Sequence, residues 1–430
     1  MTRIIKKTVT LSPKIICLLK KGVRMTAPFS VEIGDEVNPE RIAGSSIIYG
    51  AARIYGENTL ISPEVKLGFE APVTLINCQL GNAVELRGGY FTNSVFLNKA
   101  TMGSNAQVRS GCLLEEEAGG NHCVGLKQTI LFPFVQLGSL INFCDCLMAG
   151  GTSRKNHSEV GSSYIHFNYT PRQNKATPSL IGDVPRGVML REPPIFLGGQ
   201  GGIVGPVQID YGTVIPAGVI CRQDFKTEGI HWTSLSSLEK KKDSAAGASG
   251  GDITRKVKHN IEYVANLSAL RQWYHHVRRE FFMQEMYGDL LYSGACSVLD
   301  EALAERVKQL RLFAQSIETS MEVVTKKMEI IYPVSVSRAQ KQFLQDWPRM
   351  EEYLSGNSEE KIGLKKRDSF VKKMRRLSNK GNSYLESIQL LTPAQTKEGT
   401  DWLRGITKNI ITECINNNPD ASRRKEKSRV

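Results

Sequence analysis

The most regular pattern in the chain is an aliphatic residue at every sixth position between residues 30 and 220. Three separate series keep this spacing, and a glycine often follows the aliphatic residue. The series comprise Ile48, Ile54 and Leu60, then Leu80 and Leu86, and then Met102, Val108 and Leu114. A period of six fits neither the turn of a helix nor the alternation of an ordinary strand.

A six-residue repeat predicts one short strand and one turn per repeat, with three repeats in each triangular coil. The aliphatic side chain points inward and stacks on its equivalent in the next coil, and a glycine at the corner avoids a clash of its Cβ. Successive coils pair as parallel strands, so stability is close to a sum over neighbours. The pattern therefore predicts a mainly β fold, a left-handed parallel β-helix, rather than a β-sandwich.

The repeat loses its phase near residues 148–163, which predicts loops at the corners of coils. The longest polar interruption spans residues 150–183. It is the leading candidate for a site, because loops that leave a rigid scaffold commonly carry function. In order along the chain it contains His157, the pair Asn168-Tyr169, Lys175 and the closing Ile181-Gly182-Asp183.

This segment and the coils that follow it resemble the acetyltransferase half of the bacterial bifunctional N-acetylglucosamine-1-phosphate uridylyltransferase, which is also a glucosamine-1-phosphate acetyltransferase. The resemblance covers residues 155–224. The resemblance implies that His157 is the general base, a role that suits an imidazole because it titrates near neutral pH. Asn168 would stabilise the oxyanion and, with Tyr169, line the site of acetyl-CoA and the amine. Lys175 would hold a sugar phosphate. A solvated loop histidine is the alternative interpretation of His157.

The resemblance further implies that Ala217 and Arg222, in the closing coils, contact acetyl-CoA, the acyl donor. The family carries basic residues on preceding coils, whereas residues 132–151 contain none. Arg154 and Lys155 are therefore the candidates to replace them at the substrate. No glycine-rich nucleotidyltransferase loop opens the chain, and we expect no pyrophosphorylase activity.

Two functional hypotheses follow. The first is an acyl-CoA-dependent acyltransferase that acts on an amino sugar phosphate or a nucleotide sugar, related to UDP-N-acetylglucosamine biosynthesis. The missing basic residues leave a second hypothesis open, a non-catalytic β-helix that binds a sugar nucleotide or scaffolds an assembly. By resemblance we expect a homotrimer with sites between its subunits.

The pattern changes to helical spacing towards the C-terminus. Residues 236–252 are charged and then glycine-rich, which is typical of a linker, and residues 253–415 are predicted to be helical. Apolar residues three and four apart predict one long amphipathic helix, and they are Leu299, Leu303, Val307, Leu310, Ala314, Ile317, Met321, Val324 and Met328. We further predict a basic N-terminal extension (1–29), the β-helix (30–235) and a disordered basic tail (416–430).

A second helical stripe contains Trp273, Val277 and Phe281, and the neighbouring His275-His276 and Arg278-Arg279 are expected on an exposed basic face. The net charge of +13 suggests anionic partners such as phosphorylated ligands, nucleic acid or a membrane surface, and does not choose among them. The lysine-rich run at residues 359–381 could bind acidic surfaces or nucleic acid through phosphates, but it has no recognised nucleic-acid motif and a charge run is usually a solvated face, so we do not expect nucleic acid as a partner. No apolar stretch approaches the length of a membrane helix, so we expect no membrane as a partner either.

The nine cysteines are scattered along the chain, and Cys144 and Cys146 lie in an apolar, strand-like context. Such residues are typical of buried free thiols in a reducing compartment, which predicts a cytoplasmic protein. The paired Cys-x-x-Cys spacing of a strong zinc site does not occur, so no metal is predicted.

Overall fold

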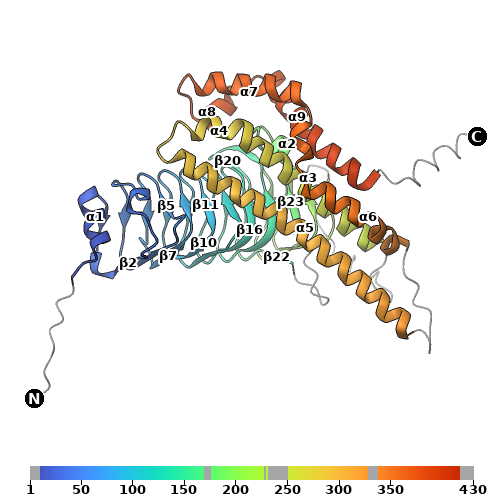
Figure 1. The fold of residues 1–430 in the computed structure, drawn as a ribbon, viewed down its shortest axis with the longest axis horizontal. Coiled ribbons are helices and arrows are strands. Elements are labelled where there is room, and N and C mark those ends of the chain that lie inside the picture. Colours follow the sequence, from blue (N-terminus) through green and yellow to red (C-terminus); the bar gives the residue numbers. More distant parts are fainter. Residues whose placement is uncertain (1–9, 169–175, 227–228, 231–249, 328–337, 417–430) are drawn as a thin grey trace, which may run out of the picture.

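The computed structural model describes residues 10–168, 176–226, 229–230, 250–327 and 338–416. Its first half is a parallel β-solenoid of about ten turns, and the helices that follow lie against the solenoid (Figure 1). The predicted parallel solenoid and the helical region after it are both confirmed. Among the described helices, none is long and apolar enough to cross a membrane. The division into domains stays a prediction.

The strands stack in three columns, which we call faces A, B and C, and neighbours within each column are parallel. Face A consists of β1 (Arg24–Met25), β3 (Ile47–Ile48), β6 (Lys66–Leu67), β9 (Glu85–Leu86), β12 (Thr101–Met102), β15 (Gly119–Gly120), β17 (Gln136–Leu137), β21 (Glu159–Val160), β24 (Phe196–Leu197), β27 (Thr213–Ile215) and β29 (Gly229–Ile230).

Face B consists of β2 (Val31–Ile33), β4 (Ala52–Tyr55), β7 (Val73–Ile76), β10 (Gly89–Thr92), β13 (Ala106–Val108), β22 (Ile165–Phe167), β25 (Gly202–Val204) and β28 (Ile220–Cys221). Face C consists of β5 (Leu60–Ile61), β8 (Gln79–Leu80), β11 (Ser94–Phe96), β14 (Cys112–Leu114), β23 (Ser179–Ile181) and β26 (Gln208–Ile209). Two longer strands, β16 (Gly125–Leu131) and β18 (Asn142–Met148), run through the corner between faces B and C and belong to both.

Most strands turn an apolar side chain into the solenoid. The series Met102, Val108 and Leu114 occupies inward positions on faces A, B and C in turn, and all three side chains are fully buried. The prediction that Leu60 points inward is wrong. Leu60 pairs with Gln79, whose side chain faces a helix outside the coil, so Ile61 takes the inward position on face C. The coil before it is one residue longer than the repeat predicts.

Face C differs from the other two because most of its outward residues are also apolar. The outward column contains Leu60, Val95, Leu113, Ile130, Leu147 and Leu180, and all of them are buried. Such a face requires a cover, since exposed apolar area is unfavourable in water. The helices provide the cover, so the solenoid and the helical region share one hydrophobic core.

The helical region begins with α3 (Gly250–Trp273), a π-helical turn (Tyr274–Arg278) and α4 (Arg279–Phe282). Next come α5 (Gly288–Lys327), α6 (Arg338–Ser355), α7 (Leu364–Ser378), α8 (Tyr384–Gln389) and α9 (Pro393–Ile411). Helix α5 is the long helix predicted, and it lies along β8, β11 and β14 of face C. Its stripe is confirmed where it is described, because all positions from Leu299 to Ile317 are buried. The Val324 side chain and Met328 lie outside the described residues.

A second prediction, that Arg278 lies on an exposed face, is also wrong. Trp273, Val277 and Phe281 are buried as predicted, but Arg278 is only 2% exposed instead of lying on a basic surface. Its guanidinium forms an ion pair with Glu116 and lies 3.7 Å from the centre of the Tyr384 ring. Glu116, at a corner of the solenoid, supplies the carboxylate. Arg278 therefore meets its ion-pair partner only when the chain is folded.

The solenoid is capped at its N-terminal end by α1 (Pro13–Lys21). Ile15 and Leu18 of this helix are buried against the first coil. A Cβ on Gly44 would lie 2.1 Å from the carbonyl oxygen of Lys21, so glycine is needed for this close approach. Part of the segment predicted as an extension therefore closes the core.

Candidate functional site

His157 lies in a hairpin that leaves the solenoid at the corner between faces C and A. The antiparallel strands β19 (Gly151–Ser153) and β20 (Asn156–His157) form the hairpin. Gly151 has a φ of 93°, and a Cβ there would lie 2.5 Å from the Cα of His157, so glycine permits the pairing. The predicted loss of phase at this corner therefore corresponds to a real excursion of the chain.

The imidazole of His157 is held by the hairpin itself. Its Nδ1 lies 2.8 Å from the carbonyl oxygen of Arg154. Because a carbonyl oxygen can only accept, Nδ1 carries the proton and Nε2 has the free lone pair of the neutral ring. The side chain of His157 is half-buried.

The tip of the hairpin carries the two cations that were predicted to contact substrate. Arg154 and Lys155 are both exposed, and Nη1 of Arg154 donates to the carbonyl oxygen of Glu117 at 3.3 Å. Both positive charges thus lie within three residues of His157 along one hairpin.

Asn168 lies at a different corner, between faces B and C, directly after β22. Its Nδ2 donates to Oδ2 of Asp145 at 3.4 Å, and Oδ1 of Asp145 accepts from Nη2 of Arg306 on α5 at 2.8 Å. His157 and Asn168 therefore lie at opposite edges of face C, and a single chain does not bring them together. Tyr169 and Lys175 lie outside the described residues.

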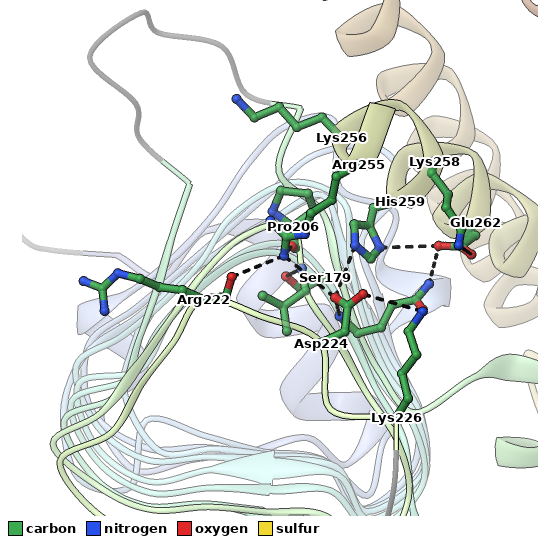
Figure 2. A network of polar contacts seen from close by, with 12 residues as sticks. Ser179, Pro206, Arg222, Asp224, Lys226, Arg255, Lys256, Lys258, His259 and Glu262 are labelled. Carbon is green, nitrogen blue, oxygen red and sulfur yellow. Dashed lines mark hydrogen bonds and ion pairs between the residues drawn. The ribbon is translucent and has the colours of Figure 1, made fainter. Parts of the chain in front are cut away.

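The two residues assigned to the acyl donor lie at the two edges of face B. Ala217 is exposed at the corner between faces A and B, and Arg222 is exposed directly after β28, at the corner between faces B and C. Arg222 contributes only its carbonyl oxygen to the network in Figure 2, where its guanidinium points away from the other side chains. Ile165 and Phe167 lie on the same face with 38% and 40% of their surface exposed.

His166 is a core residue that the motif-based prediction missed. It occupies the inward column of face B, where it pairs with Ile203, and its Nε2 lies 2.8 Å from Oγ of Ser179. Burial lowers the pKa of His166 to about 4, so the ring stays neutral. The sequence did contain a signal for this position, because His166 follows the buried Val160 by six residues, the spacing of inward residues.

A polar cluster joins α3 to the last coils (Figure 2). His259 of α3 lies 3.2 Å from Asp224 and 3.4 Å from Glu262. Burial lowers the pKa of His259, but its hydrogen bonds to these two carboxylates outweigh burial and raise the pKa overall. The pKa of Asp224 is lowered to about 2, since its bonds to His259 and to the amide of Gln208 outweigh its burial. The cluster attaches the helical region to the solenoid.

A cavity of about 320 Å³ lies between these coils, α2 (Val184–Gly187) and α9. Arg186 dominates it, and its guanidinium forms ion pairs with Asp183 and Asp210 at 2.5 Å and lies 4.7 Å from the centre of the Tyr211 ring. The charges at this cavity are thus largely paired within the chain. His157 is not among the residues that line it.

The fold and these corners define the class of the protein, a hexapeptide-repeat solenoid with polar excursions at the corners of its coils. The chain is similar to the bifunctional protein GlmU of Thermotoga maritima, with 26% identity over 217 residues, which are 49% of this chain and 42% of that protein. It is also similar to the proteins of the same name from Fervidobacterium nodosum (25% over 213 residues, 50% of this chain and 42% of that protein) and Staphylococcus haemolyticus (24% over 212 residues, 49% and 42%). No family model matches the chain.

The aligned part covers less than half the length of each of these curated relatives. The similarity and the parallel solenoid fit the acetyltransferase half of such a protein, which confirms the resemblance found in the sequence.

Proposed function

We propose that the chain is an acyl-CoA-dependent acyltransferase that acts on an amino sugar phosphate or a nucleotide sugar, related to UDP-N-acetylglucosamine biosynthesis. The observation that carries this proposal is the bond from Nδ1 of His157 to the carbonyl oxygen of Arg154. It orients the imidazole and assigns the proton of the neutral ring to Nδ1, so that Nε2 carries the lone pair that a general base requires.

In the proposed reaction the amine of the acceptor attacks the thioester carbonyl of acetyl-CoA, and Nε2 of His157 takes the proton from the nitrogen. A C–N bond forms, the C–S bond breaks, and the proton passes from the imidazolium to the departing thiolate. Arg154 and Lys155 would bind the phosphate of the acceptor, since both are exposed cations on the same hairpin. Lys175, by resemblance, would add a third positive charge.

Acetyl-CoA is proposed to lie along face B, where it supplies the acyl group. The chemistry of this face fits the donor, because the exposed Ile165 and Phe167 suit the apolar parts of the pantetheine arm and Arg222 suits a phosphate. Ala217 has no side chain beyond Cβ, so the corner there stays open for the ligand. Asn168 and Tyr169 would line the thioester end.

Because His157 and Asn168 lie at opposite edges of face C in one chain, the proposed site needs two chains. A cyclic trimer joins two different patches of each subunit. Here the patches would be the His157 hairpin of one subunit and face B of the next. The helices cover face C, so faces A and B are the ones that remain for a neighbouring chain.

The alternative is a solenoid that binds a sugar nucleotide or scaffolds an assembly without catalysis. One observation favours it, namely that the amide of Asn168 is engaged by Asp145.

The test is calorimetric titration of the full-length protein with acetyl-CoA, together with release of CoA in the presence of glucosamine 1-phosphate. We expect saturable binding that Arg222→Ala weakens and that Arg53→Ala leaves unchanged. Arg53 is the matched control, because it is an exposed arginine on face B far from the closing coils. Absence of both heat and CoA release would contradict the acyltransferase and leave the binding or scaffolding solenoid.

A further inference from the structure

A row of cations with no acidic partner among the described residues lies on and directly after α7. Four exposed cations, Lys365, Lys372, Arg376 and Lys380, follow one another at intervals of seven, four and four residues. The spacing of Lys365, Lys372 and Arg376 places them on one face of α7, and Lys380 follows in the turn after the helix; we call the four the basic stripe. The opposite face is fixed in the core, because Phe370 and Met374 are fully buried and the Phe370 ring packs 5.6 Å from that of Trp273.

The cations at the edges of α7 behave differently, because each has an acidic partner. Lys366 pairs with Asp401 at 3.4 Å, Lys373 pairs with Glu398, and Arg375 pairs with Glu280 at 2.5 Å. The nearby carboxylates are thus taken by the flanks of the helix. Within the described part of the chain, no ion pair or hydrogen bond reaches the side chains of the basic stripe.

This arrangement is unfavourable for the helix by itself. Lys372 and Arg376 repel one another, since like charges four residues apart destabilise a helix. Between residues 361 and 380 the chain has nine lysines and arginines and one aspartate, although its net charge over 430 residues is only +13. Among the described residues the charges of the stripe have no partner in the chain, so they are available to an anionic surface outside it.

Exposed apolar side chains accompany the stripe. Met283 and Met286 follow α4, Leu390 follows α8, and each is between 49% and 63% exposed. Both α4 and α8 contact α7. Leu364, the first residue of α7, is exposed as well. In Figure 1 α7 lies at the outer edge of the molecule, with no other helix beyond it in that view.

We propose that α7 and the adjoining helix ends dock on the surface of an anionic lipid membrane. Cations on a helix bind anionic headgroups, and apolar side chains beside them enter the interfacial layer. Phosphates of a nucleic acid would match the charges but offer no partner for the methionines and leucines, and the stripe has no aromatic side chain for stacking on bases. The proposal replaces the expectation that no membrane is a partner, which rested on the lack of a spanning segment.

The test is flotation of the full-length protein with vesicles of phosphatidylcholine, with and without about one-third phosphatidylglycerol. The stripe variant combines Lys365→Gln, Lys372→Gln, Arg376→Gln and Lys380→Gln. The control variant removes the same charge from exposed positions of α1 and the solenoid, by Lys20→Gln, Arg24→Gln, Lys99→Gln and Lys127→Gln. Circular dichroism of both variants verifies the fold, which the stripe variant should keep because its side chains have no partners among the described residues.

We expect the wild type and the control to bind the anionic vesicles and not the neutral ones, and high salt to release them. The stripe variant should bind at least about tenfold more weakly. A third variant, Met283→Ser with Met286→Ser, should also bind more weakly at equal charge. Equal binding of the stripe and control variants, or no binding to anionic vesicles, would overturn the proposal. Binding of duplex nucleic acid that depends on the stripe, without vesicle binding, would overturn it in favour of a nucleic-acid surface.

Discussion

Arg306 of α5 donates a hydrogen bond of 2.8 Å to Asp145 at the corner between faces B and C of the solenoid. Both side chains are buried, with 3% of Arg306 and 8% of Asp145 exposed. Asp145 has a φ of 60°, a conformation that aspartate and asparagine adopt more readily than most residues. The corner between faces B and C thus presents the carboxylate of Asp145 to helix α5, which covers it. At another corner, the carboxylate of Glu116 pairs in the same way with Arg278.

Replacement of Arg306 by methionine should strongly destabilise the fold. The change would leave the carboxylate of Asp145 buried without its charged partner, which costs about 3–5 kcal/mol in the free energy of unfolding. The double variant Asp145→Asn with Arg306→Met should be much closer to the wild type, because no buried charge remains and asparagine tolerates the positive φ.

Urea denaturation of the single and double variants, followed by tryptophan fluorescence, measures both quantities. If Arg306→Met alone were as stable as the double variant, the carboxylate of Asp145 would not depend on this arginine.

The apolar outward column of face C predicts a position-specific effect of one buried charge. Leu113→Asp should destabilise the protein by more than about 3 kcal/mol, because Leu113 is fully buried beneath α5 in an apolar column. Gln107→Asp is the matched control. Gln107 also points outward, on face B of the same turn, where it is exposed, and the change should cost less than about 0.5 kcal/mol.

Thermal unfolding measures the two effects, and trypsin cleavage of the helical region reports whether α5 detaches. Similar effects of the two substitutions would show that face C does not depend on its helical cover.

The solenoid was predictable because its spacing is a local property of the chain. Met102, Val108 and Leu114 show the period directly. One extra residue in the coil before Ile61 put Leu60 in the wrong column, because a prediction from spacing alone assumes that every coil has the same length.

The docking of the helices on face C was harder to foresee. Its signal in the sequence is a pair of adjacent aliphatic residues in place of a single one, as in Leu113-Leu114 and Ile130-Leu131. Successive side chains of a strand point to opposite sides of the sheet, so each pair places one apolar side chain inside the coil and one outside it. Such a pair predicts that the outer side is covered, but it does not identify the element that covers it.

The partners of charged residues were not predictable from spacing. Arg278 was assigned to the surface because its neighbours are basic, yet its partner Glu116 lies 162 residues away in the chain. The hairpin at His157 followed from the loss of phase, but the carbonyl of Arg154 as its acceptor depends on the path of the backbone. Predicting that His157 and Asn168 lie at two different corners would likewise have required knowledge of how many strands separate them.

Glu115 predicts a dependence of stability on pH. Burial raises its pKa from 4.5 to about 7, against the opposing effects of Arg278 and of the bond that Tyr274 donates at 2.5 Å. Between these two pH values the folded state binds more protons than the unfolded state. The contribution of Glu115 to stability is therefore greatest at low pH and falls as pH rises towards about 7.

Glu115→Gln removes this titration and keeps an oxygen that can accept from Tyr274. The free energy of unfolding of the variant should rise relative to that of the wild type between about pH 5 and pH 8, by up to about 3 kcal/mol. Urea denaturation across this range measures the difference. Parallel curves for the two proteins would mean that the carboxyl of Glu115 has the same pKa in the folded and unfolded states.

The proposed general base predicts a loss of turnover without a loss of donor binding. His157→Gln should lower kcat for acetyl transfer by about 10²- to 10⁴-fold, because an amide cannot accept the proton of the attacking amine. The dissociation constant of acetyl-CoA should stay unchanged, since the donor is assigned to face B. Arg154→Ala separates the two roles of the hairpin. The carbonyl that orients His157 belongs to the backbone and remains, so KM for the phosphorylated acceptor should rise while kcat changes little. Full activity of His157→Gln would assign proton transfer to another group.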